Sequence, residues 1–349
     1  MFTTSIASLA LIASLLGSPP GTSPVRSLEP RPIPRITAER WIVYDANADV
    51  VLASWNANQR GSIASVTKVM TAMLVIDNAD LNAVITVPGF ATKTRGSTAG
   101  LVAGEEWTIG DLLIAMLVRS GNDAALTLAY DIGGGSVSVF VGMMNARAAE
   151  LGLTNTRFAN PNGLDNEGHY STARDLLTLI IAAEGYPDIQ RISRIRLVTM
   201  PEDPNGKTRT FQNTNKLLGT YPGTLGLKTG ETPWADKVLL GVTEQAGRRI
   251  YSVVMHSDDH FADTRELVDW AFSTYSVEDR WLRPLYAEQG GGATTASLDL
   301  TVGHERRLRA MQKLNDGRWN TSSLEDLPKA QAIGRWIREA IPGVAGGDG

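Results

Sequence analysis

The chain has 349 residues and a formal net charge of −4 at pH 7, with 33 basic and 37 acidic side chains. This balance argues against a basic nucleic-acid-binding protein, and a hydrophobic content of 43% is enough to build a sizeable core. Cysteine is absent, which excludes disulfides, thiolate nucleophiles and Cys-ligated metal centres, so any catalysis must use other side chains.

The N-terminal residues have the pattern of an export signal. Residues 6–16 are mostly apolar and are followed by a Gly-Ser-Pro-Pro sequence. No Lys or Arg precedes Arg26, so the positive region of a signal is reduced to the terminal amine, and an apolar tail is the alternative interpretation. We assign residues 1–36 to an export signal and a Pro/Ser-rich linker, and we expect an exported protein on the periplasmic or cell-wall side. No internal stretch reaches the roughly 18 apolar residues of a membrane span.

The first structured elements are predicted to be a hairpin and a buried helix. Two short β-prone runs at residues 41–44 and 50–53 flank a turn-rich segment, which favours a hairpin. Residues 66–76 are apolar on every side of a helix, which indicates burial. Capping residues and helical periodicity predict four further helices: residues 112–118, 124–130, 137–151 and 172–183.

The last part of the core predicts strands again. Residues 237–243 and 250–255 are separated by a short polar turn, which is typical of a hairpin, and a helix is predicted at residues 264–275. Strands at both ends of the sequence and helices between them predict an α+β fold, with an antiparallel sheet packed against a helical subdomain. We expect this domain to span residues 37–276 and to be followed by a C-terminal extension at residues 277–349.

One histidine pair is the only candidate for metal binding by spacing. His256 and His260 are four residues apart, follow a β-branched run and lie among Ser and Asp residues. This setting favours a surface turn after a strand. We therefore expect neither a metal nor a cofactor.

Ser65 and Lys68 form a candidate nucleophile pair at the start of the buried helix. Positions i and i+3 share one helix face, so the amine can reach the serine hydroxyl. An apolar site lowers the pKa of a lysine, and the neutral amine can then accept the serine proton. A single S-x-x-K sequence is nevertheless weak, because a capping Ser followed by a surface Lys gives the same pattern.

Two further motifs strengthen this interpretation. An S-x-N sequence, Ser120 to Asn122, lies at a predicted helix–helix turn, and a K-T-G sequence, Lys228 to Gly230, precedes the strand at residues 237–243. Penicillin-binding proteins and class A β-lactamases use S-x-x-K, S-x-N and K-T-G together.

On these motifs the sequence resembles the low-molecular-weight penicillin-binding proteins, the serine-type D-alanyl-D-alanine carboxypeptidases. The resemblance covers residues 38–275 and implies a β-lactamase/transpeptidase-like fold. It extends beyond the three motifs, in the family's order, to further segments: residues 64–72, 96–105, 152–164, 169–175 and 226–230.

The resemblance also implies catalytic roles. Ser65 would attack the carbonyl between two terminal D-alanines of a peptidoglycan stem peptide, and Lys68 would accept its proton. Ser120 would pass the proton towards the leaving amine, and Asn122 would bind Lys68 and the substrate amide. Water would then release the acyl-enzyme, whereas a β-lactam would acylate Ser65 and leave slowly.

The K-T-G segment is implied to bind the substrate. Lys228 would lower the pKa of Lys68 and attract the free carboxylate of the substrate, and Thr229 would donate a hydrogen bond to it. Gly230 completes the motif, and the backbone amides of Glu231 and the nucleophile would form an oxyanion hole.

Two features depart from the family pattern. Glu231 stands where a bulky or aromatic residue is usual; a solvent-facing carboxylate would change nothing, whereas an inward one would favour a cationic or amidated substrate. In the extension, Ile333, Trp336, Ile337 and Ile341 form one apolar helix face, which favours docking onto the protein itself or contact with a membrane surface.

Other functions use overlapping residues. A D,D-endopeptidase acting on crosslinks has the same motifs, so the sequence does not separate it from a carboxypeptidase. A β-lactamase needs a carboxylate base for fast deacylation, and no E-x-x-L-N sequence is present. A non-catalytic cell-wall-binding module is disfavoured because all the catalytic residues are present.

Overall fold

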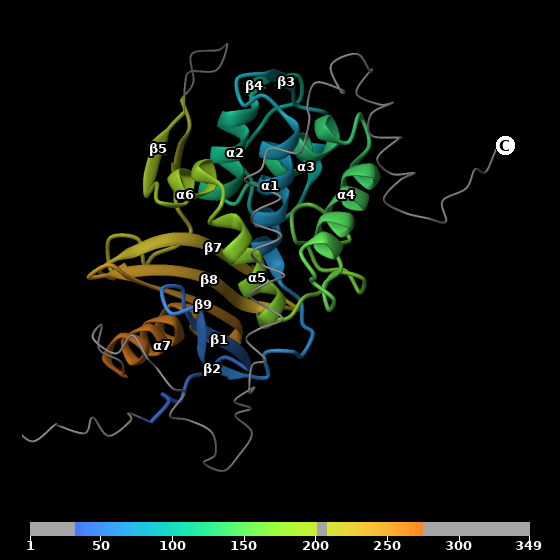
Figure 1. Cartoon of the computed structure of the whole chain (residues 1–349). Coiled ribbons are helices and arrows are strands. Elements are labelled where there is room, and N and C mark those ends of the chain that lie inside the picture. Colours follow the sequence, from blue (N-terminus) through green and yellow to red (C-terminus); the bar gives the residue numbers. More distant parts are fainter. Residues whose placement is uncertain (1–31, 201–207, 275–349) are drawn as a thin grey trace, which may run out of the picture. The chain divides into compact units, whose positions relative to one another are not determined.

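The computed structural model of the chain describes residues 32–200 and 208–274 (Figure 1). The apolar run predicted to be an export signal, the predicted C-terminal extension and the amphipathic helix predicted in it lie outside the described residues. The division into residues 1–36, 37–276 and 277–349 therefore stays a prediction.

A five-stranded antiparallel sheet joins the two ends of the described chain (Figure 1). Its order is β2 (Val50–Trp55), β1 (Arg40–Asp45), β9 (Arg248–Ser257), β8 (Asp236–Gln245) and β7 (Thr224–Thr232). The N-terminal hairpin thus pairs with the C-terminal one through β1 and β9. The predicted α+β class and both predicted hairpins are confirmed, and β7 lies at one edge of the sheet.

Helices cover both faces of this sheet (Figure 1). One face carries the helical layer: α1 (Lys68–Asn78), α2 (Ile109–Val118), α3 (Asn122–Ile132), α4 (Val137–Glu150), α5 (Ala173–Ala183) and α6 (Pro187–Ser193). The other face carries α7 (His260–Thr274). Short elements complete the described part: the 3₁₀ turns η1 (Ala64–Thr67) and η2 (Ala91–Lys93), and the strand pairs β3 (Val84–Thr86) with β4 (Glu106–Thr108) and β5 (Leu197–Thr199) with β6 (Thr210–Gln212).

The sheet separates two apolar clusters because successive side chains of a strand point to opposite faces. Ile42 and Val253 pack with α1 and α2 in the larger cluster, whereas Val43 and Val254 pack with α7 in the smaller one. The larger cluster contains residues of the sheet and of the helical layer, so these two layers share one core.

Helix ends follow the local signals in the sequence. The Thr108 hydroxyl accepts a hydrogen bond from the backbone of Asp111 at the start of α2, and Thr172 does the same for Asp175 in α5. Gly152 follows α4 with a φ of 71°, which suits glycine. The four helices predicted in the middle of the chain are confirmed.

Three expectations need correction. The buried helix begins two residues later than predicted, after the turn η1. Strand β7 was not predicted, although it contains the K-T-G motif. The surface turn expected for the histidine pair was wrong: His256 belongs to β9 and pairs with Asp236, whereas His260 begins α7 and is 6% exposed.

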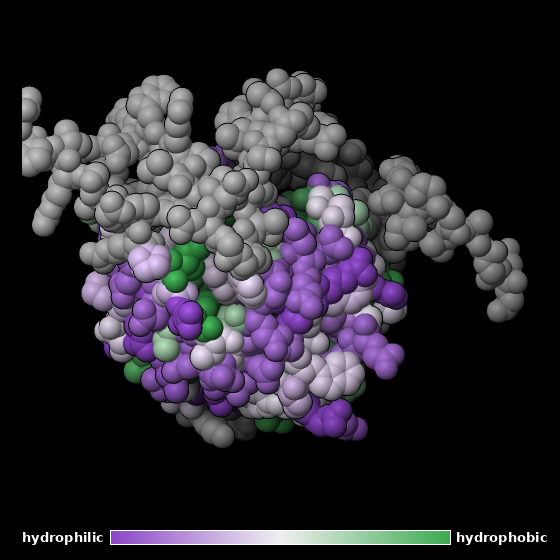
Figure 2. Space-filling model, turned by 90° about the horizontal axis from the view of Figure 1, so that it is seen from below, coloured by the Kyte–Doolittle hydropathy of each residue, from purple (hydrophilic) through white to green (hydrophobic). Residues whose placement is uncertain are grey.

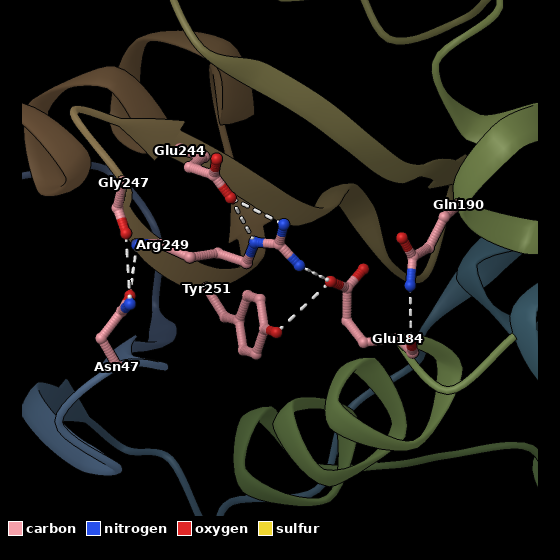
Figure 3. A network of polar contacts seen from close by, with 7 residues as sticks. All are labelled: Asn47, Glu184, Gln190, Glu244, Gly247, Arg249 and Tyr251. Atoms are coloured by element: carbon pink, nitrogen blue, oxygen red, sulfur yellow. Dashed lines mark hydrogen bonds and ion pairs between the residues drawn. The ribbon is translucent and has the colours of Figure 1, made fainter. Parts of the chain in front are cut away.

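A polar network ties the helical layer to the centre of the sheet (Figure 3). The Arg249 guanidinium on β9 donates to Glu184 at the end of α5 and to Glu244 on β8, each at 2.6 Å. Tyr251 also donates to the Glu184 carboxylate at 3.4 Å, and Gln190 of α6 donates to the Glu184 backbone carbonyl. One carboxylate therefore links α5 to the strand that lies between β1 and β8.

No single helix in the described ranges is long and apolar enough to cross a membrane; α3 and α4 pass that test only as a pair bent by 89°. The described part of the face in Figure 2 is mostly hydrophilic, with small separate hydrophobic areas.

Candidate active site

The nucleophile candidate lies where the helical layer meets the sheet. Ser65 belongs to η1 and Lys68 is the first residue of α1. The Lys68 Nζ lies 2.8 Å from the Ser65 Oγ. Ser65 is partly exposed, whereas Lys68 is 0% exposed. A hydroxyl that a substrate can reach is therefore in contact with an amine that water cannot reach.

Three oxygen atoms surround the Lys68 amine, and their chemistry fixes its orientation. Besides the Ser65 hydroxyl, Nζ contacts the Asn122 Oδ1 and the Asn162 backbone carbonyl, each at 2.7 Å. Carbonyl oxygens only accept hydrogen bonds. A neutral amine has two N–H groups, which these two carbonyls use, so its lone pair is left to face the serine hydroxyl.

The protein favours this neutral state of Lys68. Burial lowers the pKa of Lys68 well below its usual value, and the positive charge of Lys228 lowers it further. The Asp123 carboxylate acts in the opposite direction and raises this pKa. Because burial is the largest of these effects, Lys68 is suited to accept a proton.

The turn between α2 and α3 carries the S-x-N motif. Ser120 has a φ of 65°, a left-handed conformation that ends α2 and directs the chain into α3. The Asn122 Nδ2 donates to the Arg95 carbonyl at 2.6 Å. Since a carbonyl can only accept, this bond turns the Asn122 amide oxygen towards Lys68.

A second buried lysine comes from the sheet. Lys228 on β7 is 1% exposed, and its Nζ donates to the Ser120 Oγ and to the Thr229 backbone carbonyl, each at 3.0 Å. Burial lowers the pKa of Lys228 to about 7. Ser120 therefore lies against this cation from the sheet.

The rest of the K-T-G segment lies along the edge strand. The Thr229 Oγ1 donates to the Thr214 hydroxyl at 2.6 Å. A Cβ on Gly230 would lie 2.9 Å from the backbone nitrogen of Ser65, so only glycine lets β7 approach the nucleophile this closely. Glu231 is exposed, as expected for a carboxylate that faces solvent.

Sequence reasoning missed the backbone group that completes the surroundings of Lys68. The Asn162 carbonyl accepts from the Lys68 amine at 2.7 Å, and its oxygen lies 3.4 Å from the Ser65 Oγ. Its neighbour Gly163 has a φ of 86°, and a Cβ there would lie 1.9 Å from the Ala64 carbonyl oxygen. The Asn-Gly sequence indicates a tight turn, but it does not reveal where the carbonyl points.

Asp123 was also missed. Its buried carboxylate accepts from the backbone amides of Ala99, at 2.8 and 3.0 Å, and of Leu101, at 3.0 Å. These bonds fasten the loop after η2 to the start of α3, beside Asn122. The only signal in the sequence was its position directly after the S-x-N motif.

The structure thus brings together the predicted residues of all three motifs: Ser65, Lys68, Ser120, Asn122, Lys228, Thr229 and Gly230. A nucleophile, an amine of lowered pKa as base, and a second hydroxyl held by a second buried lysine are the parts needed for acyl transfer. Within residues 32–200 and 208–274, no group of three or more His, Asp or Glu side chains could hold a metal ion. Fold and site together define a serine hydrolase.

Comparisons with known proteins specify this class. A family model described as "D-alanyl-D-alanine carboxypeptidase" matches residues 27–259. The chain is 36% identical over 250 residues to the D-alanyl-D-alanine carboxypeptidase DacB2 of Mycobacterium tuberculosis, covering 69% of this chain and 84% of that relative. It is 33% identical to a D-alanyl-D-alanine endopeptidase of Escherichia coli, covering 77% and 88% of the two chains.

Solved structures agree with this relationship. The crystal structure of the Streptomyces K15 DD-transpeptidase has a TM-score of 0.67 and 30% identity, and the match covers 70% of this chain and all of that one. The chain belongs to the D-alanyl-D-alanine carboxypeptidase family of serine hydrolases.

Proposed function

We propose that the chain removes the terminal D-alanine from peptidoglycan pentapeptides through an acyl-enzyme on Ser65. The observation that carries the proposal is the contact between the Ser65 hydroxyl and the Lys68 amine, whose two N–H groups have other acceptors. The serine proton passes to the Lys68 Nζ as the Oγ attacks the carbonyl carbon.

Ser120 and Lys228 serve the departure of D-alanine. When the C–N bond of the tetrahedral intermediate breaks, the leaving amine needs a proton. The Ser120 hydroxyl, held by the Lys228 amine, relays it from Lys68. Water then attacks the ester and releases the shortened peptide, with Lys68 again accepting a proton.

The edge strand β7 binds the chain end of the substrate. The charged form of Lys228 attracts the terminal carboxylate, and the Thr229 hydroxyl, which now donates to Thr214, turns to donate to that carboxylate. The close approach of Gly230 supports an oxyanion hole made of the Ser65 and Glu231 amides.

Release of D-alanine from a pentapeptide ending in D-Ala-D-Ala tests this assignment. The wild type should release D-alanine and should form a stable adduct with a fluorescent penicillin. Ser65→Ala should abolish both, and Lys68→Ala should slow both by about 10²–10⁴-fold. Retained turnover in the Lys68 variant would show that another group is the base.

The same experiment separates two activities within the family. Relatives named as carboxypeptidases and as endopeptidases both match this chain. We expect faster turnover of the free pentapeptide than of a crosslinked dimer; the opposite order of kcat/KM would identify an endopeptidase.

We also propose that the protein acts outside the cytoplasm, where its substrate is found. The apolar run at residues 6–16 supports this proposal. Expression of the full chain with a C-terminal tag should give a shortened protein in the extracytoplasmic fraction. A protein of full length that remains in the cytoplasm would contradict it.

A further inference from the structure

His169 is a buried imidazole close to the proposed active site that has no role in the mechanism above. It is 3% exposed and packs edge-on against the Phe158 ring, with 5.8 Å between the ring centres. Both ring nitrogens have partners: Nε2 lies 2.7 Å from the Thr67 Oγ1, and Nδ1 accepts from the Ala159 amide at 3.0 Å.

These contacts fix one tautomer of His169. The Thr67 hydroxyl donates its only hydrogen to the Ala64 carbonyl, at 2.8 Å. The Thr67 oxygen must therefore accept a hydrogen bond from the His169 Nε2. Because Nδ1 already accepts from Ala159, the ring is neutral, with its proton on Nε2. Burial, together with the nearby Lys68, lowers the pKa of His169 to about 4, so this state persists at neutral pH.

The two partners of His169 belong to the two segments that meet at the base. Thr67 lies between Ser65 and Lys68 and is the last residue of η1, directly before α1. Ala159 begins the loop that brings the Asn162 carbonyl to the Lys68 amine. The imidazole therefore spans the same two segments as the contact between the amine and that carbonyl.

We propose that His169 is a positioning residue for acylation, which keeps the Asn162 carbonyl on the Lys68 amine by joining Thr67 to Ala159. The lone pair of Lys68 faces Ser65 only while both carbonyl acceptors use its N–H groups. A loop that moves away from the amine frees one N–H, and the lone pair can then turn from the serine. This inference rests on the proposed roles of Ser65 and Lys68.

The two amide variants of His169 separate its two bonds. The Gln side chain can place its nitrogen near the position of Nε2 and keep the donor to Thr67, whereas the Asn oxygen can replace Nδ1 as acceptor for Ala159. Thr67→Val removes the Thr67 oxygen at nearly constant volume. Tyr221→Phe is a matched control, because it removes a partly buried hydrogen bond to Asp269, at 2.5 Å, on the α7 side of the sheet.

The measurements are the acylation rate constant and the noncovalent binding constant of a fluorescent penicillin, obtained by stopped flow on the full chain, with the melting temperature of each variant. His169→Asn and Thr67→Val should each slow acylation about tenfold or more, since small misplacements of catalytic groups are costly. Binding before acylation should change less than about twofold, because none of these residues lies on the substrate side. The control should melt earlier and acylate at the wild-type rate.

A double variant tests whether His169 acts through Thr67. Thr67→Val combined with His169→Asn should be no slower than Thr67→Val alone, because both remove the same link. The proposal would be overturned if the losses in acylation rate of the two single variants added up in the double variant. It would also be overturned by wild-type acylation in any folded variant that lacks the hydrogen bond between Thr67 and His169. If the His169 variants do not fold, the Thr67→Val result alone decides. A wild type that does not acylate at Ser65 would instead refute the proposed function.

Discussion

At the scale of single residues, Lys228 gives the site a pH dependence. Burial lowers its pKa to about 7, so it is charged below that pH and neutral above it. A charged Lys228 attracts the terminal carboxylate of the substrate, so kcat/KM should fall as the pH rises through about 7. A pH profile of D-alanine release measures this fall. Lys228→Met should have low activity without the alkaline decline; the same decline in that variant would assign it to another group.

Gly163 sets how closely the Asn162 loop approaches the nucleophile. Its φ of 86° favours glycine, and a Cβ would lie 1.9 Å from the Ala64 carbonyl oxygen. Gly163→Ala should therefore push the loop away and slow penicillin acylation by about 10²-fold, the typical cost of a shift near 1 Å. The matched control is Gly142→Ala in α4, where a Cβ meets nothing within 4 Å.

The control Gly142→Ala should differ from Gly163→Ala in both its melting temperature and its rate of penicillin acylation. Alanine in place of a helical glycine stabilises by up to about 1 kcal/mol, so Gly142→Ala should melt at a slightly higher temperature and acylate normally. Wild-type acylation by Gly163→Ala would show that the loop can move without consequence for the base.

The side chains of the candidate site could be predicted from the sequence, but its backbone groups could not. Ser65, Lys68, Asn122 and Lys228 belong to motifs whose residue types carry their chemistry. The carbonyl of Asn162 is a group that every residue possesses, and only the path of the chain determines where it points. The same limit applies to His169, because its neutral tautomer depends on a contact with Thr67, a residue far away in the sequence.

At the scale of elements, the Arg249 network shown in Figure 3 should stabilise the junction of α5 with the sheet. Arg249 and Glu184 are 28% and 14% exposed, so water screens their ion pair only in part. Arg249→Met should lower the free energy of unfolding by about 1–2 kcal/mol, since it removes charged hydrogen bonds to two carboxylates. Thermal unfolding followed by circular dichroism measures the change.

Arg191→Met is the control for this variant. Arg191 pairs with Asp188 on the surface of α6, where the two side chains are 60% and 36% exposed. An exposed pair contributes about 0–1 kcal/mol, so this change should be the smaller one. Equal losses in the free energy of unfolding for the two variants would show that the Arg249 network contributes no more to stability than an exposed ion pair.

Helices were easier to predict than the edge strand because their signals are local. Thr108 and Thr172 cap helices with bonds that reach only three residues along the chain. Strand β7 instead contains Gly226 and Gly230, which weaken a strand pattern. Gly230 is required by the approach to Ser65, a contact between distant parts of the sequence that no local pattern contains.

At the scale of the whole molecule, the shared core predicts that the site and the sheet unfold together. Ile42 and Val253 from the sheet pack in one cluster with residues of α1 and α2. Penicillin acylation and the far-ultraviolet signal of the folded chain should therefore disappear over the same temperature range. A loss of acylation well below the main transition would mean that the helical layer melts separately.

The pairing of β1 with β9 also has a consequence for how the enzyme is made. Ser65 is synthesised early, but Lys228 and the strands that hold it follow more than 160 residues later, up to Ser257. A nascent chain on the ribosome therefore carries a chemically inert serine. The peptidase can therefore form only after translation has passed Ser257, and products truncated before that strand should not react with β-lactams.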